Sequence, residues 1–252
     1  MPENAIDPIH QFNIERIFHF RPFGVDASFT NASLLMLIIL GLIALLMLVG
    51  TSRRSMVPGR MQSAAEMTYE FVANTVRGTA GNEGMQFMPL VFSLFMFVFL
   101  ANLLGLLPFS YTVTSQIVVT FALAALVMAV VIIVGITRHG AGFLHLFAPS
   151  GVSPFILPFI ILIEVISFLA RPISLSVRLF ANMLAGHITL KVFGGFIVLL
   201  LGAAGATKFI AILPFAAIVI LTAFELLVAV LQAYVFAILT CVYLNDAIHP
   251  GH

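Results

Sequence analysis

The chain has 252 residues, of which 62% are hydrophobic and only 8% are charged. A soluble domain carries about 25% charged residues, so the composition excludes a soluble globular protein and indicates a membrane protein with several spans. The formal net charge of +1 and the lack of basic clusters speak against a nucleic-acid partner. The single cysteine, Cys241, excludes an internal disulfide, and no metal or cofactor motif such as HExxH or CxxC occurs.

The N-terminal part of the chain predicts an outer segment, a first span and an interfacial helix. Residues 1–30 carry four acidic side chains and no early basic cluster, so we expect an outer segment and no signal peptide. The apolar run 31–50 is long enough to cross a bilayer. Over 60–83, apolar residues such as Ala64, Met67 and Phe71 recur at helical spacing, which predicts an amphipathic helix lying in the membrane interface.

The remaining spans consist of a helical pair over 86–136 and two much longer apolar runs at 155–201 and 208–244. The 47 residues of the first long run would make a helix of about 70 Å at ~1.5 Å per residue. The hydrocarbon core is only ~30 Å thick. We therefore expect a strongly tilted or broken helix that bends at Pro172, with a second bend at Pro214 in the last run.

Together these elements predict an all-α polytopic membrane protein, with about five crossing helices and one interfacial helix in a single domain over 1–252. The orientation follows from the basic residues of the loops. The loop at 108–116 has no charge. The loops after the first and third spans carry Arg53, Arg54, Arg60, Arg138, His139 and His145. The positive-inside rule then places the N-terminus outside and the C-terminus in the cytoplasm.

The sequence LGAAGATK at 201–208 predicts the turn of a long tilted hairpin over 155–244. If the two helices fold back around Gly205, residues at equal depth have numbers that add up to about 410. This register sets the polar residues of one helix against those of the other. It pairs Arg178 with Gln232, Asn182 with Val228 and Ala229, and His187 with residues 223–225.

Small residues accompany Arg178 along one face of the first long helix and recur in the last helix. They are Ser167, Ala170, Ser174, Ala181 and Ala185, followed by Ala229, Ala233 and Ala237. Stripes of small residues let helices approach closely. Static packing within the bundle and a smooth surface for a moving partner helix are both compatible with this pattern.

Ionisable residues stand inside these apolar runs, where an arginine costs roughly 2.5–3.5 kcal/mol at a helix centre. Arg171 can reach the cytoplasmic surface, whereas Arg178 has apolar sequence on both sides and is either salt-bridged or functional. Its guanidinium stays protonated, so it can hold a carboxylate ionised or block a proton leak. His187 points about the opposite way and is level with Glu225, and this pair is either a proton relay or a satisfied buried histidine.

Two of these segments carry a family resemblance. RPISLSVRLFANMLAGH at 171–187 and FELLVAVLQAYVFAILTCVYL at 224–244 strongly resemble subunit a of the F-type ATP synthase. The shorter segments DPIHQF at 7–12 and ANLLGLLP at 101–108 resemble other recurring parts of that subunit. The resemblance implies a non-catalytic stator subunit that offers two offset aqueous half-channels to a rotating ring of c subunits. Peripheral-stalk b-type subunits, protons and the lipid bilayer are the other implied partners.

The resemblance also implies residue roles. Arg178 matches the essential arginine, which would draw the proton off the ring carboxylate and separate the half-channels, and Asn182 and Gln232 match its polar neighbours. His187 and Glu225 match the pair of the outer half-channel, in the order of mitochondrial forms. Weaker matches are Asn102 and Gln116 as channel-lining residues and Glu164 near the cytoplasmic exit, where it is level with Asp246. Gly105 stands where some relatives have an acid.

Alternatives to this interpretation stay open. A proton-coupled secondary transporter often shows two similar halves, but the arginine segment has no repeat within 1–125. A sodium-driven version of the same complex is possible because ion choice rests mainly on the ring. An intramembrane hydrolase would need a histidine partner for the serines of APSGVS at 148–153. The expected location is the bacterial inner membrane, with the mitochondrial inner membrane as the alternative.

Overall fold

The computed structural model describes residues 16–18, 28–52, 58–107, 111–140, 142–143, 155–203 and 205–249. Five helical segments in this part of the chain are long and apolar enough to cross a membrane, which confirms the predicted all-α polytopic fold. Residues 7–12 and 148–153, the loop residues Arg53 and Arg54, and His145 lie outside the described residues.

The elements follow the chain in the predicted order. A short antiparallel pair, β1 (Arg16–Phe18) and β2 (Phe29–Thr30), precedes the helices and was not predicted. The α-helices are α1 (Asn31–Ser52), α2 (Arg60–Gly84), α3 (Met88–Gly105), α4 (Ile117–His139), α5 (Leu157–Gly202) and α6 (Ile212–Ile248). The connections include the 3₁₀ segments η4 (Met85–Phe87), η5 (Val113–Ser115) and η7 (Gly205–Ala211).

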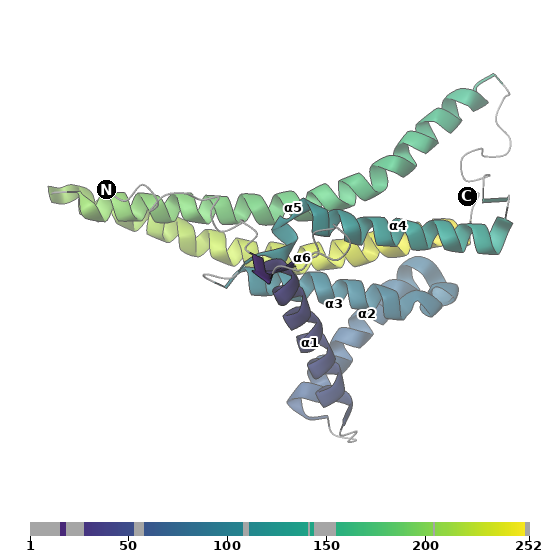
Figure 1. The fold of residues 1–252 in the computed structure, drawn as a ribbon, viewed down its shortest axis with the longest axis horizontal. Helices are drawn as coiled ribbons and strands as arrows, with labels where there is room; N and C mark the ends of the chain where they lie inside the picture. Colours follow the sequence, from purple (N-terminus) through teal and green to yellow (C-terminus); the bar gives the residue numbers. More distant parts are fainter. Residues whose placement is uncertain are drawn as a thin grey trace.

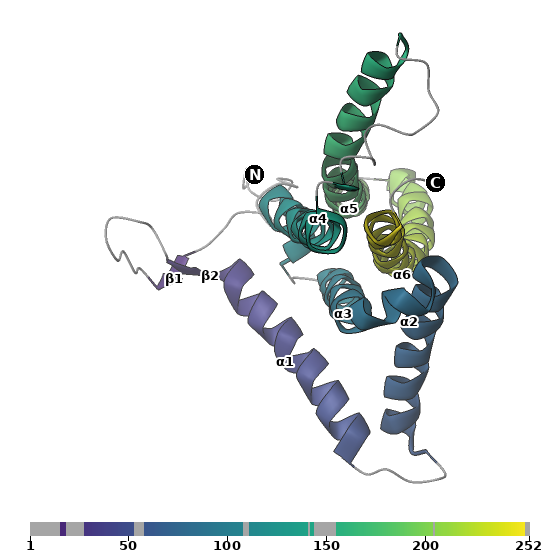
Figure 2. The same cartoon turned by 90° about the vertical axis from the view of Figure 1, so that its right-hand side faces the viewer.

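Helix α6 is the centre of the bundle, because it packs against α2, α3, α4 and α5. Figure 2 shows α3 to α6 gathered together, with α1 and α2 leaning away from them on one side. The buried core lies mainly between these gathered helices and includes Val98, Val127, Leu179 and Phe236. Most large apolar side chains on the outside of the bundle are exposed, as expected for helices that face lipid.

The last two helices form the predicted hairpin, which projects beyond the other helices (Figure 1). Helix α5 has 46 residues and is about 69 Å long. It contains Pro172 and is visibly bent (Figure 1), in keeping with the missing backbone hydrogen bond of an interior proline. At the turn Gly205 has φ 82°, a left-handed conformation that glycine adopts without a steric penalty.

One prediction about these helices is wrong. Pro214 does not bend the last helix, because α6 begins at Ile212 and the first N–H groups of a helix have no partner within it. In α2 the buried face carries Ala65, Val72, Ala73, Val76 and Ala80.

Met67 and Phe71, on the apolar side predicted for this helix, are 66% and 47% exposed, which suits an apolar side that faces lipid. Small residues form the packed face because they allow close contact between helices. The position of α2 in the membrane interface stays a prediction.

Candidate functional site

The hydroxyl side chains of the spans fall into two groups. Ser93, Thr137, Thr189 and Thr222 each donate to the carbonyl four residues earlier in their own helix, at 2.7–2.8 Å. Such bonds satisfy a hydroxyl without any polar neighbour. Thr112, Thr114 and Thr120 contact polar side chains of other segments. These contacts trace the polar interior of the bundle.

His187 and Glu225 lie together in this interior. Their side chains are 8% and 6% exposed, and Nδ1 of His187 is 3.9 Å from Oε1 of Glu225. Nε2 of the same imidazole lies 3.0 Å from the hydroxyl of Thr112. The predicted depth of His187 against Glu225 is therefore confirmed, and α5, α6 and the connection before α4 each contribute one side chain.

The carboxyl group of Glu225 is packed beside Gly186, one residue before the histidine. A Cβ atom at position 186 would overlap Oε1 of Glu225 and lie 2.8 Å from its Cδ, so only glycine leaves room for the carboxyl group there. No described side chain donates a hydrogen bond to either oxygen of Glu225. A cavity of about 220 Å³ adjoins it, lined also by Asn182, Thr189 and Val228. The cavity is mostly apolar, but its volume and the polar groups of Asn182, Thr189 and Glu225 leave room and partners for ordered water.

Asn102 occupies a second buried position. Its amide nitrogen is 3.3 Å from the carbonyl of Ala229, and its carbonyl oxygen accepts a bond from Thr114 at 2.8 Å. It thereby ties α3 to α6 and to the connection before α4. Gln116 is half-buried and directly precedes α4. Burial raises the pKa of the neighbouring Tyr111 above its usual value, so this phenol stays protonated at neutral pH.

Arg178 lies on the opposite side of α5 from His187 and is exposed. The side chain of Gln232 donates to the backbone carbonyl of Arg178 at 2.8 Å, which confirms the predicted register. The part of the chain described by the structure offers the guanidinium itself no ion pair or hydrogen bond. A structural salt bridge for Arg178 is therefore not found among these residues. Asn182, one turn further along, is also exposed.

The two stripes of small residues differ in solvent exposure. Ala229, Ala233 and Ala237 of α6 are buried within the bundle, so static packing explains them. The small residues of α5 that share the side of Arg178 are instead exposed, namely Ser167, Ala170, Ser174, Ala181 and Ala185. This face of α5 therefore carries small side chains around a positive charge that no described carboxylate pairs with.

At the other end of the hairpin, Glu164 and Asp246 face each other as predicted, but an arginine stands between them. Arg171 is 2.7 Å from Asp246 and 3.7 Å from Glu164. The rings of Phe168 and Tyr243 lie 5.7 and 5.2 Å from its guanidinium carbon, within cation–π range. Arg171 therefore makes specific ion pairs there, and it offsets one of the two carboxylate charges of the predicted acidic mouth.

Comparison with known proteins matches residues 33–245 to the model of a family described as ATP synthase A chain. The chain belongs to this family. It is 64% identical over 249 residues to ATP synthase subunit a of Beijerinckia indica, covering 99% of this chain and 98% of that protein. Subunits of the same name from Chelativorans sp. and Azorhizobium caulinodans are 61% and 62% identical over 250 residues, covering 98% of this chain and 100% of theirs.

Membership in the ATP synthase A chain family decides between the functional alternatives. The chain is a non-catalytic, proton-conducting stator subunit in the membrane sector of an ATP synthase, with the c-ring and b-type subunits as partners. It is a multi-pass plasma-membrane protein. The interpretations as a secondary transporter and as an intramembrane hydrolase are wrong.

Several polar residues of this ATP synthase A chain were missed in the sequence. Thr112 and Thr114 contact the predicted residues His187 and Asn102, and Thr120 meets Ser176 at 3.1 Å across α4 and α5. The feature of the sequence that could have located Thr112 and Thr114 is the uncharged polar run SYTVTSQ at 110–116. It resembles an ordinary loop, and only the packing of the helices reveals that it is buried.

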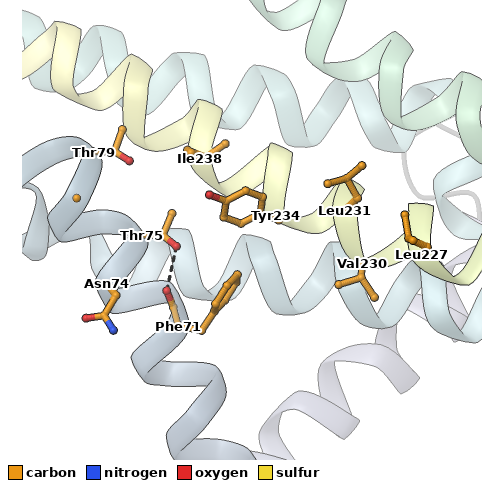
Figure 3. A pocket seen from close by; sticks show the side chains of 10 residues that line it. Phe71, Asn74, Thr75, Thr79, Leu227, Val230, Leu231, Tyr234 and Ile238 are labelled. Carbon is orange, nitrogen blue, oxygen red and sulfur yellow. Dashed lines mark hydrogen bonds between the residues drawn. The ribbon is translucent and has the colours of Figure 1, made fainter.

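A larger cavity does not coincide with this polar network. It measures about 830 Å³ and lies between α2 and α6. Figure 3 shows Phe71 and Tyr234 facing this space from the two helices, with Asn74, Thr75 and Thr79 along α2. Its lining contains no carboxylate, imidazole or cationic side chain. Cavity volume alone therefore does not locate the chemistry in this protein.

Proposed function

We propose that α5 separates two steps of proton transfer, with Arg178 on its outward face and the His187–Glu225 pair on its inward face. The exposed guanidinium meets the carboxylate of each passing c subunit and draws its proton off, because an arginine remains charged. The same charge prevents protons from crossing directly between the half-channels. The exposed small residues of α5 support this role by leaving a smooth surface for the ring helices.

The outer half-channel leads past Glu225 and His187 to the ring. A carboxyl group and an imidazole 3.9 Å apart are beyond direct hydrogen-bond distance, and they exchange a proton through one water or after a small approach of the two side chains. Asn182 borders the cavity beside Glu225 and carries the path toward the ring face. Asn102 and Gln116 line the approach from α3 and α4, and Gln232 holds the backbone at Arg178.

The inner half-channel releases protons near Glu164. Asp246 and Glu164 supply two carboxylates there, and Arg171 lies between them as a counter-charge in a half-buried place. Each elementary charge that crosses 100 mV releases ~2.3 kcal/mol, so several protons are needed per ATP.

The orientation that fits this path has the N-terminus outside and the C-terminus in the cytoplasm of a bacterial inner membrane. Residues 1–30 then form an outer segment and 60–83 an interfacial helix of one membrane domain over 1–252. Arg60 at the start of α2 and Arg138 at the end of α4 support this orientation by the positive-inside rule.

The observation that carries the proposal is the exposed guanidinium of Arg178, which has no ion pair among the described residues and lies on the helix face opposite the buried His187. Its test uses vesicles with an imposed proton gradient. Arg178→Ala should abolish ATP synthesis while the complex still assembles. Arg138→Ala is the matched control, because it removes an arginine whose ion pair with Glu83 is solvent-exposed, and it should retain synthesis. Retained synthesis in Arg178→Ala would contradict the proposal.

A further inference from the structure

We infer that Thr112, on the connection between α3 and α4, is a positioning residue for His187. This inference rests on the proposed role of His187 in proton transfer. The hydroxyl oxygen of Thr112 lies 3.0 Å from Nε2 of His187. The two residues are 0% and 7% exposed, so water does not compete freely for this contact. With Nε2 held by Thr112, the other nitrogen of the ring is directed at Glu225.

A second contact of Thr112 links its orientation to the tautomer of His187. The Thr112 hydroxyl also donates to the carbonyl of Gly105 at 3.4 Å, and a hydroxyl has only one proton to give. When that proton points at Gly105, Nε2 of a neutral imidazole carries the hydrogen and donates it to Thr112. Nδ1 is then the basic nitrogen and can accept a proton from Glu225.

When the hydroxyl of Thr112 turns toward Nε2, the assignment reverses. Nε2 becomes the acceptor and Nδ1 carries the hydrogen that faces Glu225. The orientation of one hydroxyl thus selects one or the other neutral tautomer of His187, and Thr112 itself neither gains nor loses a proton. This is the way a hydrogen-bond partner on one ring nitrogen decides the chemistry of the other.

The surroundings of Thr112 limit its movement. A Cβ atom at Gly105 would lie 2.7 Å from the methyl carbon of Thr112, so the methyl group occupies space that a side chain at 105 would need. Ser115 donates to the carbonyl of Thr112 at 2.6 Å. Gly105, where some relatives carry an acid, thus leaves room for the methyl group of Thr112.

The test measures ATP-driven proton pumping by the whole complex in vesicles as a function of pH. The charged and titratable groups near His187 are Glu225 of α6 and Lys191 one turn along α5, and both are left unchanged. Thr112→Val keeps the shape and removes the hydroxyl. It should lower the rate about three- to tenfold, the factor of one net hydrogen bond, and should move the midpoint of the pH profile. Thr112→Ser should restore both.

Thr120→Val is the matched control, because it removes another fully buried hydroxyl, which contacts Ser176 and not His187. It should leave the pH midpoint in place. If Thr112→Val does not assemble, Gly105→Ala serves instead, since its methyl group displaces Thr112, and it must move the midpoint too. An unmoved midpoint in the variant that assembles, or no recovery in Thr112→Ser, would overturn the inference.

A His187→Gln background separates this inference from the proposed function. If the proposed function holds, His187→Gln slows pumping, and Thr112→Val then adds no further loss. If His187→Gln pumps at the unaltered rate, the relay and the inference both fail. If His187→Gln is slow but Thr112→Val lowers the rate equally in both backgrounds, the relay stands and Thr112 does not act through His187.

Discussion

Replacing Gly186 by alanine perturbs the proton path with a single methyl group. The new Cβ would overlap Oε1 of Glu225 and lie 2.8 and 3.2 Å from its Cδ and Cγ. Real Cβ contacts are longer than this, so the carboxyl group has to move. It is already 3.9 Å from Nδ1 of His187, and displacement from Gly186 interrupts the transfer between them.

The size of the effect follows from a matched pair of variants in the same helix. A Cβ at Gly194 of α5 would have no neighbour within 4 Å. Both substitutions gain the same helix propensity, about 0.8–1 kcal/mol, so this gain cancels in the comparison. What remains is the cost of overpacking at Gly186, about 1–3 kcal/mol. We therefore expect Gly186→Ala to be less stable than Gly194→Ala by about that amount.

Two measurements check this expectation. Thermal dissociation of the purified complex in detergent compares the stability of the two variants. Proton-driven ATP synthesis in vesicles compares their function, and we expect a loss in Gly186→Ala and a rate near that of the unaltered complex in Gly194→Ala. Equal stability and equal rates for the two variants would refute the close packing of Glu225 against α5.

Two further predictions concern the hairpin. With Cys241 replaced, cysteines at positions 178 and 232 should be joined by a short bifunctional thiol reagent in membranes. The reason is that the side chain of Gln232 donates to the backbone carbonyl of Arg178 at 2.8 Å. If this pair is not joined while cysteine pairs one turn away are, the register is refuted. Asp246→Asn should cost about 1–2 kcal/mol in stability, less than a fully buried ion pair, because Arg171 and Asp246 are 18% and 32% exposed. A double-mutant cycle with Arg171→Gln that gives no coupling energy would contradict this pairing.

The fold could be predicted from the sequence because the bilayer accepts few structures. Apolar runs of sufficient length have to be helices in lipid, where every backbone group must be satisfied within its own segment. The register of α5 against α6 was also accessible, since a short turn at Gly205 leaves little freedom in pairing residues by depth. Arg178 with Gln232 and His187 with Glu225 follow from that register alone.

The contacts that complete the site depend on the tertiary structure. Thr112 belongs to a run of polar residues that is typical of exposed loops. Only the packing of η5 against α5 buries it beside His187. The place of Arg171 between Glu164 and Asp246 likewise depends on the bend of α5 and on the rotation of α6 about its axis.

The sequence by itself therefore determined the number, length and pairing of the helices. It also identified the charged residues within the apolar runs as candidate functional residues, because such residues are costly in lipid. Periodicity fixes which residues share a face of one helix, but it leaves open which faces of neighbouring helices meet. The tertiary structure decided that the small residues of α5 stay exposed while those of α6 are buried. The physical reason is that α6 is surrounded by four helices, whereas no helix in the described part of the chain covers the side of α5 that carries Arg178.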